Sequence, residues 1–95
     1  MNLRIVKGTA KPGHVETVAR LWEESVGVKL AGLTEFRRAY FGGDATGTAF
    51  SVVTVWERFP DPAVSRQLLS GYEARVKDLI DGPLAVEEYT LLVEV

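Results

Sequence analysis

The chain has 95 residues, of which 46% are apolar and 25% charged, and its formal net charge is −2. This balance is typical of a folded soluble protein and excludes intrinsic disorder, which needs low hydrophobicity and high net charge. The length predicts a single domain over residues 1–95. A domain this small has little interior, so the apolar fraction raises the question of what covers these residues.

Several classes of site are excluded because the residues they need are absent or rare. There is no cysteine, which excludes disulfides, cysteine–zinc sites and thiol nucleophiles. The single histidine, His14, is too little for a multi-histidine metal site. No apolar run approaches the roughly 20 residues of a membrane span, and the first residues lack a signal-peptide core. We therefore expect a cytoplasmic protein with no metal and no membrane partner.

Residues 3–9 are short, apolar and β-branched, which predicts a first strand. Pro12 suits the first turn of a helix, and Gly27 is expected to weaken or end it. Residues 28–32 are ambiguous and allow an extra turn. The helix itself is predicted by apolar residues at helical spacing: Val15, Val18, Ala19, Trp22 and Val26.

Two β-prone segments, 33–41 and 48–58, flank the turn-forming residues 42–47 and predict an antiparallel hairpin. The second segment alternates between two sets of residues that are both largely apolar. A strand that is apolar on both sides should be covered on both sides.

Asp61 and Pro62 form a typical helix start, a capping carboxylate followed by proline at the first helical position. Residues 81–83 are expected to stop this helix, and residues 84–95 to form the last strand. The resulting order, β-α-β-β-α-β, is the ferredoxin-like α+β pattern with an antiparallel sheet. The second helix is predicted by Val64, Leu68, Tyr72, Val76 and Leu79.

In this architecture both helices cover one face of the sheet and leave the other face open. A large apolar face in water indicates an interaction surface, and a second copy related by two-fold symmetry is the simplest cover. We therefore expect a homodimer. The candidate dimer-face residues are Phe50, Val52, Tyr89, Leu91 and Val93.

Several short motifs along the chain resemble those of the antibiotic biosynthesis monooxygenase (ABM) family of dimeric α+β barrel proteins. They are Pro12-Gly13 before the first helix, Ala31-Gly32-Leu33 before the second strand, and Trp56-Glu57-Arg58 at the end of the third. The resemblance implies a homodimeric α/β barrel and a pocket between sheet and helices that Trp56 lines. It also implies oxygenase chemistry on an aromatic or enolisable substrate without a cofactor.

The chain departs from the family at the catalytic positions. The cofactor-free monooxygenases carry an asparagine four residues before the tryptophan, where this chain has Val52, and a tyrosine six residues after it, where this chain has Pro62. The heme-degrading branch needs a tryptophan and a histidine on the second helix, and this helix has neither. Two functions therefore remain open: a small-molecule-pocket protein that includes a cofactor-independent monooxygenase, and a non-catalytic homodimeric ligand-binding or assembly module.

Five residues are ligand-pocket candidates, each with a structural alternative. Trp56 either stacks on an aromatic ligand or fills the core, and Tyr72 either offers its hydroxyl to a pocket or is a bonded core tyrosine. His14 is either a general base or a solvated residue near the helix start. Arg37 and Arg38 should point to opposite faces of the strand, so one should face inward and could bind a carboxylate or enolate. The alternative for these arginines is an ion pair with a neighbouring glutamate.

A nucleic-acid partner is not expected. RNA-recognition motifs share this topology and stack bases on strand aromatics. The first strand here has no aromatic residue, and the chain is acidic. The expected partners are a second copy of the chain and a small aromatic or apolar ligand.

Overall fold

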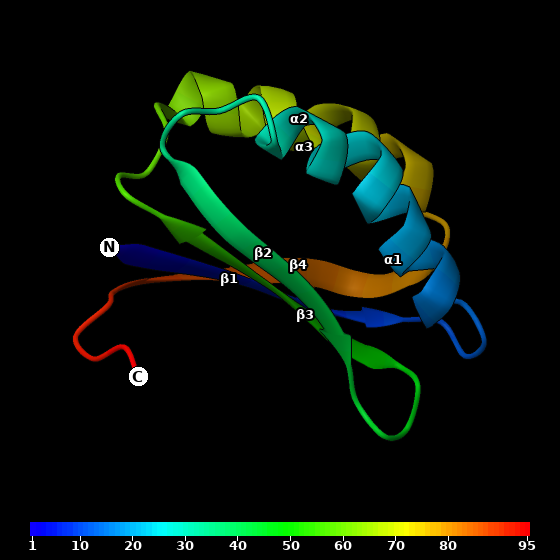
Figure 1. Cartoon of the computed structure of the whole chain (residues 1–95). Helices are drawn as coiled ribbons and strands as arrows, with labels where there is room; N and C mark the ends of the chain where they lie inside the picture. The colour runs from blue at the N-terminus through cyan, green and yellow to red at the C-terminus, as the bar shows by residue number, and fades with distance from the viewer.

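Four antiparallel strands form one sheet in the computed structural model, which describes residues 1–95 (Figure 1). The order β2-β3-β1-β4 places β1 and β3 in the centre. This is the ferredoxin-like α+β arrangement that the sequence predicted. The strands are β1 (Asn2–Ala10), β2 (Phe36–Gly43), β3 (Ala49–Trp56) and β4 (Ile80–Thr90).

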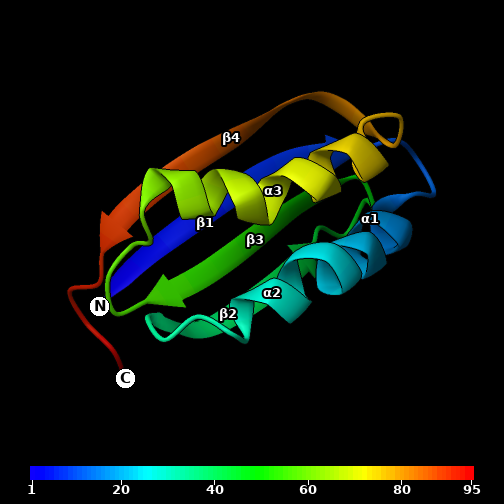
Figure 2. The same ribbon diagram turned by 90° about the horizontal axis from the view of Figure 1, so that it is seen from above.

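Two helical segments lie side by side across one face of the sheet (Figure 2). The first runs from α1 (Val15–Trp22) through a π-helical turn, η1 (Glu23–Gly27), into the short α2 (Val28–Leu30). Gly27 does not end this helix. Helical structure continues because Val26 and Leu30, on either side of the glycine, are both buried. Tertiary packing thus overrides the low helix propensity of glycine.

The second helix, α3 (Pro62–Val76), begins where the sequence predicted. The Asp61 carboxylate accepts a hydrogen bond from the Ala63 N–H at 2.8 Å. The expectation that residues 81–83 stop this helix was wrong, because it ends at Val76 and residues 81–83 already belong to β4. The ladder is irregular there. Asp81 pairs with Thr9 and Ala85 pairs with Lys7, so the extra residues of β4 between these two pairs bulge out of the ladder.

The core lies between the helices and one face of the sheet. On β3 this face carries Phe50, Val52, Thr54 and Trp56, all buried. Phe50 and Val52 were expected on the open, dimer-forming face, and this placement corrects that expectation. Both alternating sets of β3 are largely apolar, so their polarity alone did not identify the inner one. The bulkier set, with the phenylalanine and the tryptophan, fills the space below the helices.

Gly8 of β1 lies under two core side chains. A Cβ added there would stand 2.6 Å from both the Leu84 Cδ2 and the Phe50 Cζ. The absence of a side chain at this position therefore lets the core close over the strand.

The opposite face of the sheet has no covering element (Figure 1). It carries Leu3 and Ile5 of β1 beside Val55 and Val53 of β3, their register partners. These four side chains are only partly buried. Tyr40 and Tyr89 on the outer strands are 55% and 49% exposed. We call these six residues the open face.

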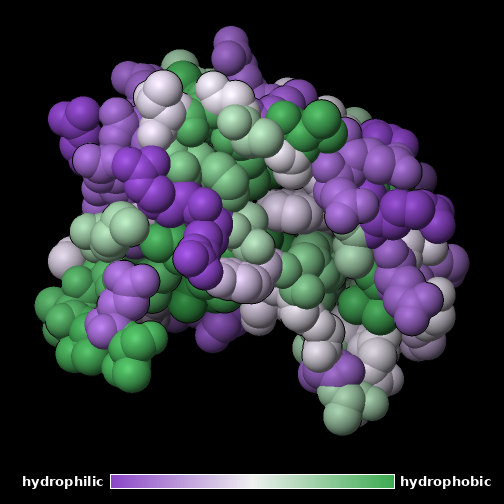
Figure 3. Space-filling view, viewed as in Figure 1, coloured by the Kyte–Doolittle hydropathy of each residue, from purple (hydrophilic) through white to green (hydrophobic).

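The last strand begins and ends earlier than predicted, because residues 84–95 were expected and β4 spans Ile80–Thr90. It ends at Thr90, which pairs with Asn2 at the start of β1. Beyond this point only Met1, which precedes β1, is left as a partner, and its carbonyl accepts a hydrogen bond from the Leu91 N–H at 2.9 Å. Leu91 and Val93, expected in the strand, therefore lie in a C-terminal tail, where Val93 is 75% exposed. Figure 3 shows hydrophobic surface at this end of the molecule.

None of the helices combines the length and the hydrophobicity that a membrane crossing requires.

Candidate functional site

A small cavity of about 40 Å³ lies between the sheet and the helices. Its walls come from β1, β3, the first helical segment and α3, so every layer of the fold contributes. Most of the lining is apolar, and both tryptophans of the chain are part of it. An apolar pocket with a few convergent polar groups is the usual form of a small-molecule site. The polar groups in the lining belong to Arg4, Thr54 and Ser65.

Trp56 is both a cavity wall and a core residue. It is 1% exposed, and its indole Nε1–H donates to the Thr54 hydroxyl at 2.8 Å. That hydroxyl donates in turn to the Arg4 carbonyl at 3.4 Å. The Phe36 ring meets the indole edge-on, with ring centroids 5.5 Å apart. These contacts hold the indole in one orientation, with its polar atom already satisfied.

Arg4 is the only charged residue that lines the cavity. Its side chain is 16% exposed and leaves β1 on the helix side of the sheet. Its Nη1 donates to the Ser65 hydroxyl at 3.2 Å, and its Nη2 lies 3.7 Å from a Glu88 carboxylate oxygen. The guanidinium carbon stands 5.0 Å from the centre of the Phe59 ring and 6.0 Å from that of Trp56, within cation–π range.

Sequence reasoning missed Arg4, although a signal was present. Arg4 and Lys7 are the two charged residues of β1, and their odd spacing places them on opposite faces of the strand. A charged residue at this position must lie on one face or the other, and the register places it opposite Thr54, on the inner face. Assigning the faces of the strand correctly would have identified it.

Arg37 and Arg38 do not reach the cavity, so the expectation of an inward arginine on this strand was wrong. A bulge interrupts β2 here, because Phe36 pairs with Trp56 while Arg38 pairs with the adjacent Val55. The extra residue, Arg37, breaks the alternation, and both arginines are exposed. Arg37 forms an ion pair with Glu57 and donates to the Thr34 carbonyl at 2.8 Å.

Tyr72 is 3% exposed, and its hydroxyl donates to the Val18 carbonyl at 3.3 Å. It packs in the core and is not part of the cavity wall. Burial raises the pKa of this hydroxyl above its usual value, because the charged phenolate is poorly solvated there. His14 is exposed at the N-cap of α1 and makes no capping hydrogen bond through its side chain. Neither residue contacts the cavity.

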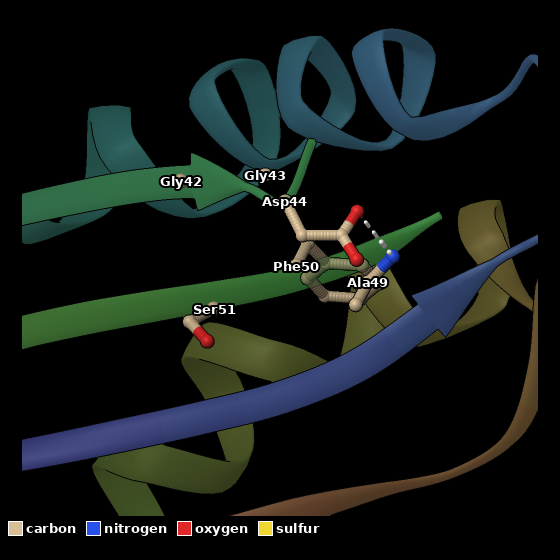
Figure 4. Close-up of a pocket in the computed structure, with 6 residues that line it drawn as sticks. All are labelled: Gly42, Gly43, Asp44, Ala49, Phe50 and Ser51. Atoms are coloured by element: carbon tan, nitrogen blue, oxygen red, sulfur yellow. Dashed lines mark hydrogen bonds between the residues drawn. The ribbon is translucent and has the colours of Figure 1, made fainter. Parts of the chain in front are cut away.

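A second hollow, open to solvent, lies at the β2–β3 hairpin and has a volume of about 300 Å³ (Figure 4). The Asp44 carboxylate turns back over the loop and accepts hydrogen bonds from the Thr46 hydroxyl and the Ala49 N–H. These bonds lower the pKa of Asp44. Because this carboxylate is engaged in closing the turn, the hollow is a feature of the hairpin and not a candidate anion site.

No group of three histidine, aspartate or glutamate side chains is placed to hold a metal ion. Of the polar groups of the cavity wall, the Thr54 hydroxyl already donates to the Arg4 carbonyl. The Arg4 guanidinium and the Ser65 hydroxyl are the donors suited to an anionic or carbonyl oxygen.

No family model matches the sequence, and no curated protein matches it. Solved structures do match, over nearly the whole chain. A candidate antibiotic biosynthesis monooxygenase from Nitrosomonas europaea superposes with a TM-score of 0.81 at 17% identity, covering 98% of this chain and 100% of that one. Another candidate from Bordetella bronchiseptica gives 0.78 at 12% identity, covering 97% of each chain.

The monooxygenase of the ActVA-Orf6 gene of Streptomyces coelicolor, solved with the ligand nanaomycin D, gives a TM-score of 0.77 at 16% identity. The match covers 99% of this chain and 89% of that one. At these identities the likeness establishes a shared fold. The chain therefore has the ABM-like fold that its sequence motifs suggested.

Proposed function

We propose that this chain binds a small, largely apolar, planar ligand between its sheet and its helices. The observation that carries the proposal is the lining of the cavity, where both tryptophans, apolar side chains and only three polar residues converge. The cavity adjoins an open groove of about 410 Å³ that shares four of its lining residues, so the space is not limited to the cavity. Indole rings offer flat, polarisable surfaces on which an aromatic ligand can stack. The fold is shared with a monooxygenase solved in complex with the ligand nanaomycin D, which supports small-molecule binding by a chain of this fold.

Ligand binding is tested by isothermal titration of the protein with naphthamide, a neutral planar probe. We expect saturable binding to the wild type. Ser65 lines the cavity and is only half-buried on α3, so Ser65→Phe should fill the space and abolish binding without disrupting the core. Ser70→Phe is the matched control, because it places the same ring on an exposed position of the same helix. Equal binding by all three proteins would contradict the proposed location.

Cofactor-independent monooxygenation is the second candidate function, and the fold shared with proteins named monooxygenases favours it. In such a reaction the substrate loses a proton and its anion passes an electron to oxygen. Here the cavity wall offers a cation that stabilises the anion but no carboxylate, imidazole or phenol to accept the proton. Oxygen uptake with quinol and polyphenol substrates tests this function. Oxygen uptake that Ser65→Phe abolishes would support monooxygenation. The absence of uptake with every substrate of the panel would contradict it and favour a non-catalytic binding module.

We further propose that the open face joins two copies of the chain about a two-fold axis. The centre of this face is aliphatic, and beside it Lys7 and Glu87 pair with each other at 2.9 Å. A self-complementary apolar face flanked by paired charges suits an isologous contact. Tyr89 lies on this face, and Leu91 and Val93 stand in the tail beside it, so they remain candidates for the interface.

Sedimentation at micromolar concentration tests the dimer. We expect the wild type to sediment as a dimer and Val55→Lys, which puts a charge in the middle of the open face, to sediment as a monomer. Val28→Lys makes the same change at an exposed valine on the helix side and should leave the dimer intact. A wild-type monomer would contradict the proposal.

A further inference from the structure

Arg4 is one of four residues that lie between two spaces in the structure. On one side is the cavity of about 40 Å³ described above, and on the other is an open groove of about 410 Å³ between the first half of α3 and β4. Arg4, Val6, Ser65 and Leu69 line both. The inner space alone is too small for an aromatic ring, since a cavity that accepts benzene measures about 150 Å³. A ring can enter only where the two spaces join, and Arg4 stands at that junction.

The guanidinium of Arg4 has N–H donors without a protein partner, and these donors reach solvent, since no buried side-chain nitrogen lacks a hydrogen bond. An arginine carries five N–H donors, and this one makes a single hydrogen bond, to the Ser65 hydroxyl. Glu88 stands at 3.7 Å, beyond hydrogen-bond distance, and its own side chain is 46% exposed. The guanidinium also faces the aromatic rings of Phe59 and Trp56. Cationic donors beside aromatic surfaces are suited to a planar ligand that carries an oxyanion.

We propose that Arg4 recognises the anionic oxygen of an aromatic ligand, a carboxylate, phenolate or enolate, and so determines the specificity of the site. The ligand enters through the groove between α3 and β4. Its oxyanion takes the place of Glu88 as the partner of Arg4, and movement of the Arg4 side chain joins the groove to the inner cavity. This inference rests on the proposed ligand-binding function and adds the chemical class of the ligand.

Two nearly isosteric probes, naphthoate and naphthamide, differ in charge and test the inference by calorimetric titration. We expect the wild type to bind naphthoate about tenfold more tightly than naphthamide, as charge-assisted bonds exceed neutral ones. Arg4→Gln should remove most of this preference and leave naphthamide binding within about twofold. Arg4→Lys should keep only part of the preference for naphthoate, because an ammonium lacks the two-pronged geometry of a guanidinium. Arg58→Gln, at an arginine 79% exposed and paired with Glu35, is the control and should change nothing.

Glu88→Gln provides an independent test that does not depend on removing Arg4. Because Glu88 competes with the ligand for the guanidinium, this substitution should strengthen naphthoate binding severalfold and leave naphthamide unchanged. Equal affinities of the wild type for both probes, or weaker naphthoate binding by Glu88→Gln, would overturn the role of Arg4 while the binding function stands. If neither probe binds the wild type, both proposals fail.

Discussion

Removing the Thr54 hydroxyl while keeping the shape of its side chain should destabilise the protein through Trp56. Thr54→Val leaves the indole N–H, buried on a side chain 1% exposed, without the acceptor it now has at 2.8 Å. An unsatisfied buried donor costs about 1–3 kcal/mol. For a domain of this size, a loss of 2 kcal/mol lowers Tm by roughly 8–16 °C.

A double-mutant cycle isolates this contact. Trp56→Phe removes the donor, so Thr54→Val should destabilise that variant by about 1–2 kcal/mol less than it destabilises the wild type. The free energies of unfolding are measured by denaturant titration of all four proteins at one protein concentration, since a dimer would make stability concentration-dependent. If the two substitutions are simply additive, the hydrogen bond does not anchor the indole and the reasoning about the cavity wall is refuted.

Two further predictions concern the strands. Gly8→Ala should destabilise by about 1–3 kcal/mol because its Cβ overlaps core side chains, as overpacking does. Gly42→Ala meets no atom within 4 Å and should be near neutral, and equal effects in denaturant titration would refute the packing argument. The pKa of Tyr89 is raised by the carboxylate of Glu87, which accepts its hydroxyl hydrogen bond, so Tyr89 should keep its proton above the usual tyrosine pKa of about 10. Glu87→Gln should lower that pKa toward the usual value in an ultraviolet titration, and an unchanged titration would argue against the contact.

The order of elements was predictable because each has a strong local signal. The alternation of the strands, the helical spacing around Tyr72 and the Asp61-Pro62 cap do not depend on distant residues. The end of β4 was not predictable in this way. It is set by where β1 begins, because residues beyond Thr90 have almost no partner to pair with.

The candidate site was predicted only in part. Trp56 was expected either to line a pocket or to fill the core, and it is a core residue, 1% exposed, that also lines the cavity. The inward arginine was sought on the wrong strand, since the bulge at Arg37 breaks the alternation on which that expectation rested. Phe50 and Val52 were assigned to the wrong face because β3 is apolar on both sides. The odd spacing of Arg4 and Lys7 indicated one inward charge on β1, and the register of β1 with β3 identifies it as Arg4.

The central claim, that a small molecule binds between the sheet and the helices, is tested most directly by heteronuclear NMR. Trp22 and Trp56, the only tryptophans, both line the cavity, so their two indole N–H signals report on it specifically. During titration with naphthoate we expect both signals to shift along one binding curve, while the backbone amides of Val53 and Val55 on the open face stay in place. Shifts confined to the open face, with both indole signals unmoved, would contradict the account.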